Sequence, residues 1–222
     1  MGTPYFGKEI LKKLHTDFSV HTVVCQPDKP VGREKKIIYS EVKNFALKAN
    51  LKILQPEKIK NNEAFLNELR KINPDFIFVA AYGKILTNDI LDIPKFGCIN
   101  VHSSLLPKYR GAAPINWSII NGDKETGVTI MEMDEGMDTG NIILSKKIAI
   151  AESDNVSSLT ENSSGFIDPT RSMSIFLLLP VRHCVPDSIS ISLRFLSNFP
   201  NFVIKTWLTK TLFIFLFYHI RT

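Results

Sequence analysis

The sequence predicts an α/β protein built around a doubly wound, mostly parallel β-sheet. Short apolar runs alternate with segments of helical periodicity between about residues 20 and 150. The run 76–81 is apolar throughout, which is typical of a strand covered on both faces. Another apolar run, 98–101, leads into a loop rich in serine, proline and glycine, where sheets of this class bind their ligands. These three observations predict the fold class and the place of its site.

A glycine turn precedes the first predicted helix. The turn at residues 2–4 opens a helix over 6–14, and 20–25 is the first strand that the pattern indicates. A turn of this kind normally follows a strand. The sequence starts too late to include that strand. The loop 26–36 combines helix breakers with cations, so it is either a solvated linker or a loop that binds an anion.

Two amphipathic helices flank the next predicted strand. Ser40 can cap a helix with an apolar stripe, and 51–54 follow as a short strand. The clearest helix of the chain starts at Asn61 or Asn62 and stops at 73–75. It is clear because apolar and charged side chains occupy opposite faces of the helix.

One more helix and three strands are predicted after residue 110. Pro114 suits the first position of a helix, and Gly122 lies just past its end. Strands are predicted over 127–133, 141–144 and 147–150, with an acidic loop containing two glycines after the first of them.

The chain changes character after about residue 157. Serines become frequent, helical periodicity fades and prolines recur, so we expect a folded domain over 1–156 and an irregular or non-native tail over 157–222. The segment 202–220 is strongly apolar, but its uninterrupted run 212–218 is far shorter than the roughly 20 residues of a membrane helix. We therefore expect no membrane anchor.

Composition narrows the classes of function. The net charge of +5 permits an anionic partner, yet the basic residues are scattered except at 33–36. The three cysteines are far apart and in no metal-binding spacing, so neither a disulfide framework nor a metal site is indicated. A reducing cytoplasm is the simplest location, and the first residues lack the features of a signal peptide.

Three polar residues have the parts for transferring an acyl group to an amine. Asn100 and His102 are two apart on a predicted strand and so share a face, although His102 alone could be an ordinary core histidine. An amide stabilises an oxyanion and an imidazole accepts the amine's proton. A carboxylate such as Asp138 orients the imidazole and favours its charged form. No hydroxyl or thiol nucleophile with a matching base is evident, so direct attack by the amine is favoured over a covalent intermediate.

At these residues the sequence resembles the folate-dependent formyltransferases, above all the members that formylate methionyl-tRNA. The resemblance covers about two thirds of the chain. It is carried by four motifs that occur in order: Asn-Val-His at 100–102, Ser-Leu-Leu-Pro at 104–107, Arg-Gly-Ala-Ala-Pro-Ile at 110–115 and Asp-Thr-Gly at 138–140.

The resemblance implies a Rossmann-like formyltransferase fold and assigns residues to roles. Asn100, His102 and Asp138 would be the catalytic trio. Four residues would contact the formyl donor, 10-formyltetrahydrofolate: Ser104, Leu105, Leu106 and Pro107. Three residues of the basic loop would approach the acceptor stem of initiator methionyl-tRNA: Arg33, Lys35 and Lys36. We expect a monomeric enzyme of translation initiation.

The sequence departs from the family in three ways. A strand expected in the middle of the sheet is missing before the first turn, and Glu34 replaces a glycine usual in the basic loop. Beyond about Thr160 neither a closing helix nor a tRNA-binding β-barrel domain is recognisable. Because a central strand is bonded on both edges and buried on both faces, its loss leads us to expect low stability and weak activity. Two alternatives stay open: a formyltransferase for a small amine such as glycinamide ribonucleotide or an amino sugar, and a non-catalytic remnant. The Gln-Pro-Asp motif at 26–28 and the basic loop favour tRNA.

Overall fold

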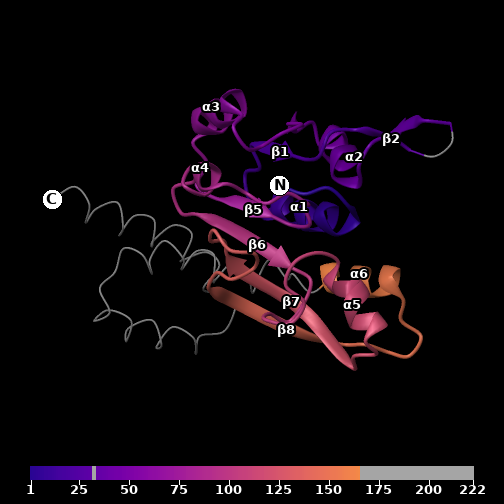
Figure 1. Ribbon diagram of the computed structural model, residues 1–222. Coiled ribbons are helices and arrows are strands. Elements are labelled where there is room, and N and C mark those ends of the chain that lie inside the picture. The colour runs from indigo at the N-terminus through magenta and orange to yellow at the C-terminus, as the bar shows by residue number, and fades with distance from the viewer. Residues whose placement is uncertain (32–33, 166–222) are drawn as a thin grey trace, which may run out of the picture. The chain divides into compact units, whose positions relative to one another are not determined.

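The structure is a computed structural model, which describes residues 1–31 and 34–165 (Figure 1). Helices and strands alternate along these residues, as the sequence predicts. In chain order the elements are α1 (Tyr5–Asp17), β1 (Thr22–Val24), β2 (Lys29–Val31), β3 (Lys36–Ile38), α2 (Glu41–Lys48), β4 (Lys52–Leu54), α3 (Glu63–Ile72), β5 (Ile77–Val79), α4 (Asn88–Leu91), β6 (Cys98–His102), α5 (Pro114–Ile120), β7 (Glu125–Glu132), β8 (Ile142–Ala149) and α6 (Val156–Gly165).

The strands form a parallel half and an antiparallel half. β1 pairs with β4 and β5 with β6, both in parallel, whereas β7 runs antiparallel to β6 and to β8 (Figure 1). The predicted α/β class is confirmed, and the sheet combines parallel pairs with antiparallel ones. The short connection 133–141 accounts for the antiparallel pair of β7 and β8, because a parallel crossover needs roughly a dozen residues or more.

β8 is one continuous strand where the sequence predicts two. Its central residues Ser145, Lys146 and Lys147 are exposed, and they interrupt the apolar pattern. In the four-stranded sheet β8 lies at the edge, where charged lysines are common because they discourage pairing with another chain. The polar residues that divide the apolar pattern of β8 therefore reflect its position at the edge of the sheet.

Met1 and Gly2 lie between the two sets of parallel strands. The Gly2 amide donates to the Val24 carbonyl at 3.0 Å, and the Ala80 amide donates to the Met1 carbonyl at 2.9 Å. Gly2 and Ala80 also form a parallel bridge. Two residues thus pair with both neighbours at the position where the resemblance implies a central strand.

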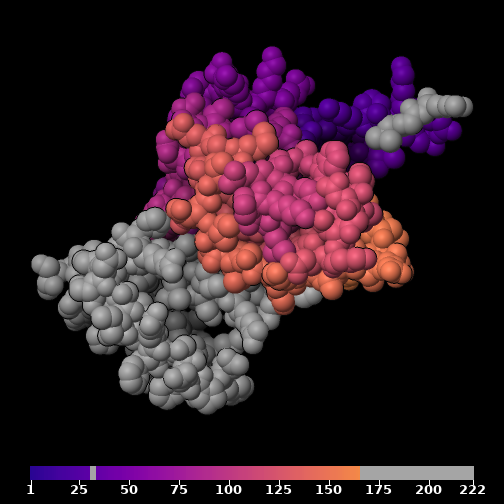
Figure 2. Space-filling model, turned by 60° about the horizontal axis from the view of Figure 1, so that its bottom comes forward, coloured from indigo at the N-terminus to yellow at the C-terminus, as the bar shows by residue number. Residues whose placement is uncertain are grey.

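A hairpin replaces the predicted loop 26–36. β2 and β3 pair in antiparallel register, with Lys29 opposite Ile38. All three residues of β3 are exposed, and the hairpin projects from the rest of the described surface (Figures 1 and 2). Gly32 and Arg33 lie outside the described residues.

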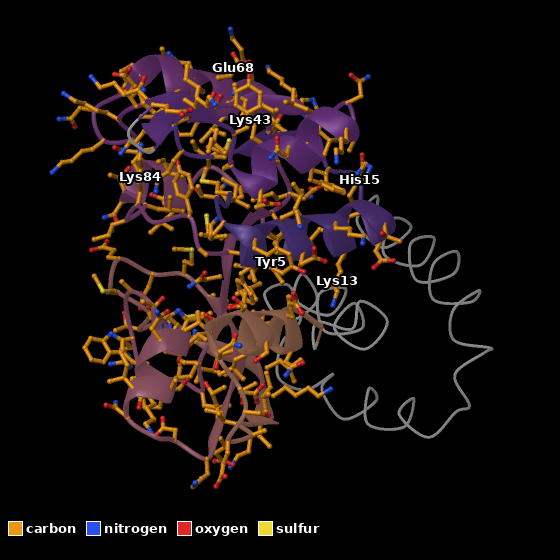
Figure 3. All side chains as sticks on the ribbon, turned by 90° about the vertical axis from the view of Figure 1, so that its right-hand side faces the viewer. Tyr5, Lys13, His15, Lys43, Glu68 and Lys84 are labelled. Atoms are coloured by element: carbon orange, nitrogen blue, oxygen red, sulfur yellow. The ribbon has the colours of Figure 1, made fainter. Side chains whose placement is uncertain are left out.

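Helix α6 occupies residues that the sequence pattern predicts to be irregular. Leu159 on this helix is fully buried, and α6 packs against α1 and α5. Lys13 of α1 lies on the side that faces α6, and its Nζ donates to the Ser164 carbonyl at 2.6 Å (Figure 3). The predicted tail therefore begins with a helix. Its remaining residues, 166–222, lie outside the described part of the chain.

Apolar side chains from the helices cover the sheet. One core cluster joins α3 and α4 to β5 and β6, and another joins α1, α5 and α6 to the sheet from β6 to β8. Such packing fixes the carboxyl end of β6, because Ile99 and Val101 of that strand are buried. Within 1–31 and 34–165, no helix is long and apolar enough to cross a bilayer.

Candidate active site

The carboxyl end of β6 presents Asn100 and His102, as the sequence predicts. Every residue of β6 is buried, and these two are the polar ones. Asn100 lies opposite Met131 and His102 opposite Thr129 of β7. β7 therefore holds the backbone of both residues, and β5 pairs with Asn100 from the other side.

The loop after β7 brings Asp138 to these residues. Asn100 Nδ2 donates to Asp138 Oδ1 at 3.0 Å, and the Gly111 amide donates to Asp138 Oδ2 at 2.7 Å. Arg110 Nε donates to the Asp138 carbonyl at 2.9 Å. Asp138 itself has a φ of 54°, in the left-handed region, so these bonds hold a strained backbone in place. The carboxylate is thus fixed before any ligand binds.

His102 contacts two acceptors, one at each ring nitrogen. Nε2 lies 2.8 Å from the Tyr109 carbonyl oxygen, and Nδ1 lies 3.6 Å from Asp138 Oδ2. Because a carbonyl only accepts, Nε2 must carry the hydrogen. In the neutral ring Nδ1 then has a free lone pair, so His102 can accept a proton on the side of Asp138.

Ser104 holds the turn that follows β6. Its side chain is fully buried, and Oγ donates to the Lys108 carbonyl at 2.6 Å. Thr129 Oγ1 donates to the Ser104 carbonyl at 2.7 Å and accepts from the Leu106 amide at 3.1 Å. The Ser104 hydroxyl therefore shapes the turn, and the contact of Ser104 with the formyl donor stays a prediction.

The rest of this turn is accessible. Leu105 and Leu106 are half-buried, and Pro107 is exposed. Leu105 packs over Gly127 of β7: a Cβ at that position would lie 2.5 Å from Leu105 Cδ2 and 2.2 Å from the Lys146 carbonyl oxygen. Glycine at 127 thus makes room for the apolar wall that the turn presents.

The cysteine of β6 is unsuited to nucleophilic attack. Burial raises the pKa of the Cys98 thiol to about 12, so it stays protonated at neutral pH. Burial also raises the pKa of the Cys25 thiol. Among the described residues, neither cysteine supplies a thiolate near neutral pH, in keeping with direct attack by an amine.

The base of the hairpin is fastened by the Gln-Pro-Asp motif. Asp28 pairs with Lys43 of α2, labelled in Figure 3, and this bond lowers the pKa of the Asp28 carboxyl. Gln55 Nε2 donates to the Gln26 carbonyl at 2.9 Å, and Gln26 Nε2 to the Tyr82 carbonyl at 2.8 Å. The motif therefore anchors the hairpin to the body of the protein.

Two of the three residues predicted to contact tRNA lie on the described part of that hairpin. Lys35 and Lys36 are exposed, and Lys36 Nζ pairs with Glu34 at 2.7 Å. The glutamate thus neutralises one of the two described cations. Arg33, the third predicted residue, lies outside the described residues.

Comparison with known proteins identifies the family. A family model described as "Formyl transferase" matches residues 1–165. The chain belongs to this family. The match extends through α6, past the predicted boundary at residue 156, so α6 is part of the formyl transferase region.

Two curated relatives with high identity carry the same name. The chain is 58% identical over 160 residues to methionyl-tRNA formyltransferase of Caldanaerobacter subterraneus subsp. tengcongensis, which covers 72% of this chain and 52% of that relative. It is 54% identical over 152 residues to methionyl-tRNA formyltransferase of Clostridium tetani, covering 68% and 49%. The chain spans about half the length of these relatives.

Solved structures agree on the fold. Phosphoribosylglycinamide formyltransferase from Streptococcus pneumoniae TIGR4 matches with a TM-score of 0.63 at 20% identity, covering 79% of this chain and 96% of that one. The enzyme of the same name from Bacillus halodurans matches with a TM-score of 0.60 at 24% identity, covering 74% and 84%. At these identities the likeness supports the Rossmann-like formyltransferase fold alone.

Sequence reasoning missed the backbone groups of this formyl transferase site. The Tyr109 carbonyl and the Gly111 amide bind His102 and Asp138, and main-chain groups leave no mark in residue type. The one available signal was Gly111, whose φ of 85° favours glycine.

Proposed function

We propose that this chain transfers the formyl group of 10-formyltetrahydrofolate to the α-amino group of initiator methionyl-tRNA. The observation that carries the proposal is the convergence of Asn100 and His102 on the carboxylate of Asp138 in a member of the formyl transferase family. The acceptor follows from the relatives, which are named methionyl-tRNA formyltransferase at 51–58% identity.

In the proposed reaction His102 acts as the general base. The amine attacks the formyl carbon, a bond forms between them, and the amine's proton passes to Nδ1 of His102. The resulting imidazolium has an acceptor at each nitrogen, Tyr109's carbonyl and the Asp138 carboxylate. Nδ1 and Oδ2 are 3.6 Å apart, longer than a hydrogen bond, which is common before a substrate binds.

Asn100 supplies the stabilisation of the developing oxyanion. One hydrogen of its amide group is directed to Asp138 Oδ1. The Nδ2 group has a second hydrogen, which can bind the formyl oxygen as that oxygen gains negative charge. When the bond to the folate nitrogen breaks, the carbonyl reforms on the methionyl amine, and the folate nitrogen leaves with the proton that His102 had accepted.

Leu105, Leu106 and Pro107 form the proposed contact with the donor. They follow His102 in sequence and are partly or fully accessible. Two apolar side chains and a proline suit the flat aromatic part of a folate. Ser104 supports this turn from within.

The hairpin is the proposed contact with the tRNA. Lys35 and Lys36, together with Arg33, would meet the phosphates of the acceptor stem. We further propose a monomeric, cytoplasmic enzyme whose catalytic domain ends after α6, because the family model ends at residue 165. A small amine as acceptor has weaker support, since the solved phosphoribosylglycinamide enzymes named above are 20% and 24% identical to this chain.

Single-turnover formyl transfer by the full chain tests the proposal. With 10-formyltetrahydrofolate and methionyl-tRNA, His102→Ala should reduce the rate by roughly 10²–10⁴, because the general base is lost. Asn100→Ala should reduce it by roughly 10²–10³, because an oxyanion donor is lost. Donor affinity should stay nearly unchanged in both variants.

Matched controls come from exposed residues of the same types. His21→Ala and Asn116→Ala should leave the rate unaltered, since both residues are exposed. Glycinamide ribonucleotide and an amino sugar serve as competing acceptors. Faster transfer to either one, or wild-type rates in both site variants, would contradict the proposal.

A further inference from the structure

Two hydrogen-bond acceptors compete for the ring of neutral His102, and together they determine which ring nitrogen carries the hydrogen. Asp138 Oδ2 near Nδ1 favours a hydrogen on Nδ1, whereas the Tyr109 carbonyl favours a hydrogen on Nε2. The carbonyl is the closer of the two, at 2.8 Å against 3.6 Å. If the carbonyl turned away, the hydrogen could move to Nδ1, and the lone pair would then point away from Asp138.

The direction of this carbonyl depends on a strained residue. Tyr109 has a φ of 57°, in the left-handed region that a side chain disfavours. Such a conformation costs of order 1–3 kcal/mol and persists only where neighbouring contacts hold it. The contacts that hold Tyr109 therefore also influence which ring nitrogen of His102 carries the hydrogen.

Those contacts come from the turn that follows α5. The Tyr109 hydroxyl donates to Asp123 Oδ2 at 2.7 Å and accepts from Asn121 Nδ2 at 2.8 Å. Lys108 Nζ binds the other carboxylate oxygen, Asp123 Oδ1, at 2.8 Å. The Lys108 carbonyl accepts from Ser104 Oγ at 2.6 Å, so residues 108 and 109 are held from both sides.

Asp123 is the centre of this arrangement. Its side chain is 16% exposed, and it takes one hydrogen bond on each oxygen. The bonds from Lys108 and then from Tyr109 lower the pKa of the Asp123 carboxyl, so it is ionised at neutral pH. The Asp123 backbone is also fixed, because its amide donates to the Ser118 carbonyl at 3.0 Å.

We propose that Asp123 and the Tyr109 hydroxyl are positioning residues that keep the hydrogen of neutral His102 on Nε2. Asp123 holds the Tyr109 side chain, the side chain holds the left-handed backbone, and the backbone carbonyl selects the tautomer. The inference rests on the proposed function, in which Nδ1 of His102 receives the proton of the acceptor amine.

The tautomer can be measured without any substrate. In the full chain labelled with ¹⁵N-histidine, the shifts of the two ring nitrogens at alkaline pH show which one carries the hydrogen, and a His102→Gln variant assigns the signal. Wild type should show the hydrogen on Nε2. Tyr109→Phe and Asp123→Leu should both populate the form with hydrogen on Nδ1.

The same variants are then compared in formyl transfer. By analogy with the partners that orient metal-bound histidines, whose loss costs about 10- to 100-fold, Tyr109→Phe and Asp123→Leu should slow transfer by about that much. Asp123→Asn should stay close to wild type, because its amide oxygen still accepts from the Tyr109 hydroxyl. Lys108→Met is the matched control. It removes the bond from Lys108 Nζ to Asp123 Oδ1 and leaves the bond from the Tyr109 hydroxyl to Asp123 Oδ2.

Each outcome supports or overturns the proposal. An unchanged tautomer in both Tyr109→Phe and Asp123→Leu overturns it, and so does a changed tautomer with wild-type rates. Circular dichroism and thermal unfolding establish that each variant is folded, and Asp123→Asn supplies a conservative rescue. If the wild-type chain transfers no formyl group, the proposed function fails, whereas the tautomer still decides the positioning role.

Discussion

The carboxylate of Asp138 organises the site at the scale of single residues. It accepts from Asn100 and from the Gly111 amide, and it faces His102. These contacts join three segments, namely β6, the turn at Gly111 and the loop of Asp138, so a shift of any one of them would move the proposed base relative to the proposed amide donor. Preorganisation of this kind is what makes electrostatic catalysis effective, because little rearrangement is needed during the reaction.

Glu34 offers a single-residue test of the basic hairpin. Its carboxylate pairs with Lys36 and adds a negative charge where phosphates are proposed to bind. Glu34→Gly should tighten tRNA binding and steepen its dependence on salt by roughly one unit of slope, since one more cation becomes available. Binding is measured by fluorescence titration over a series of salt concentrations.

The triple replacement of Arg33, Lys35 and Lys36 by alanine is the opposing variant. It should weaken binding and flatten the salt dependence by roughly one unit for each lost phosphate contact. Lys12→Ala, an exposed lysine on α1, is the control. Identical salt slopes in wild type and in the triple variant would mean that the hairpin is an ordinary solvated segment.

At the scale of elements, α6 is a helix held by few apolar contacts. Leu159 is its one fully buried apolar side chain, and Ser163 and Ser164 are buried beside it. The Ser163 hydroxyl has no hydrogen-bond partner among the described residues. A buried hydroxyl without a partner costs about 1–3 kcal/mol, so α6 carries a local weakness.

Ser163→Ala should therefore stabilise the protein. The expected gain is about 1 kcal/mol beyond that of Ser157→Ala, an exposed position on the same helix that controls for the higher helix propensity of alanine. Urea unfolding of the full chain measures both variants. Equal gains at the two positions would show that the Ser163 hydroxyl is satisfied in solution.

At the scale of the whole molecule, β1 with β4 and β5 with β6 are connected through Met1 and Gly2. The terminal amino group of Met1 donates to the Phe78 carbonyl, and backbone bonds to Val24 and Ala80 link these two residues to the neighbouring strands. The site lies at the end of β6, so its geometry depends on that connection. Any substitution that separates Gly2 from Ala80 should act on the fold as a whole.

Gly2→Ala tests this dependence. An added Cβ would lie 2.8 Å from the Ala80 carbonyl oxygen and 3.4 Å from the Gly7 Cα, so backbone must move. We expect a loss of about 1–3 kcal/mol in the free energy of unfolding, the usual cost of overpacking. Thermal unfolding measures it. Gly165→Ala, where no heavy atom lies within 4 Å of the added Cβ, should be neutral by comparison.

The sequence by itself determined the alternation of helices and strands and the shared face of Asn100 and His102. Both follow from local rules: apolar periodicity, caps such as Ser40 and Asn62, and the two-residue repeat of a strand. The family motifs added Asp138, which no local pattern connects to β6. The alternation of elements and the shared face of Asn100 and His102 could be predicted because residues close in sequence are enough to specify them.

Tertiary structure alone decided the rest. The antiparallel direction of β7, the hairpin of β2 and β3, and helix α6 depend on what each segment packs against, so their local patterns were ambiguous. The inward turn of Ser104 and the bond from His102 to the Tyr109 carbonyl join groups brought together only by the folded loop. Main-chain acceptors are the same at every residue, and for this reason only the fold could show which one selects the tautomer of His102.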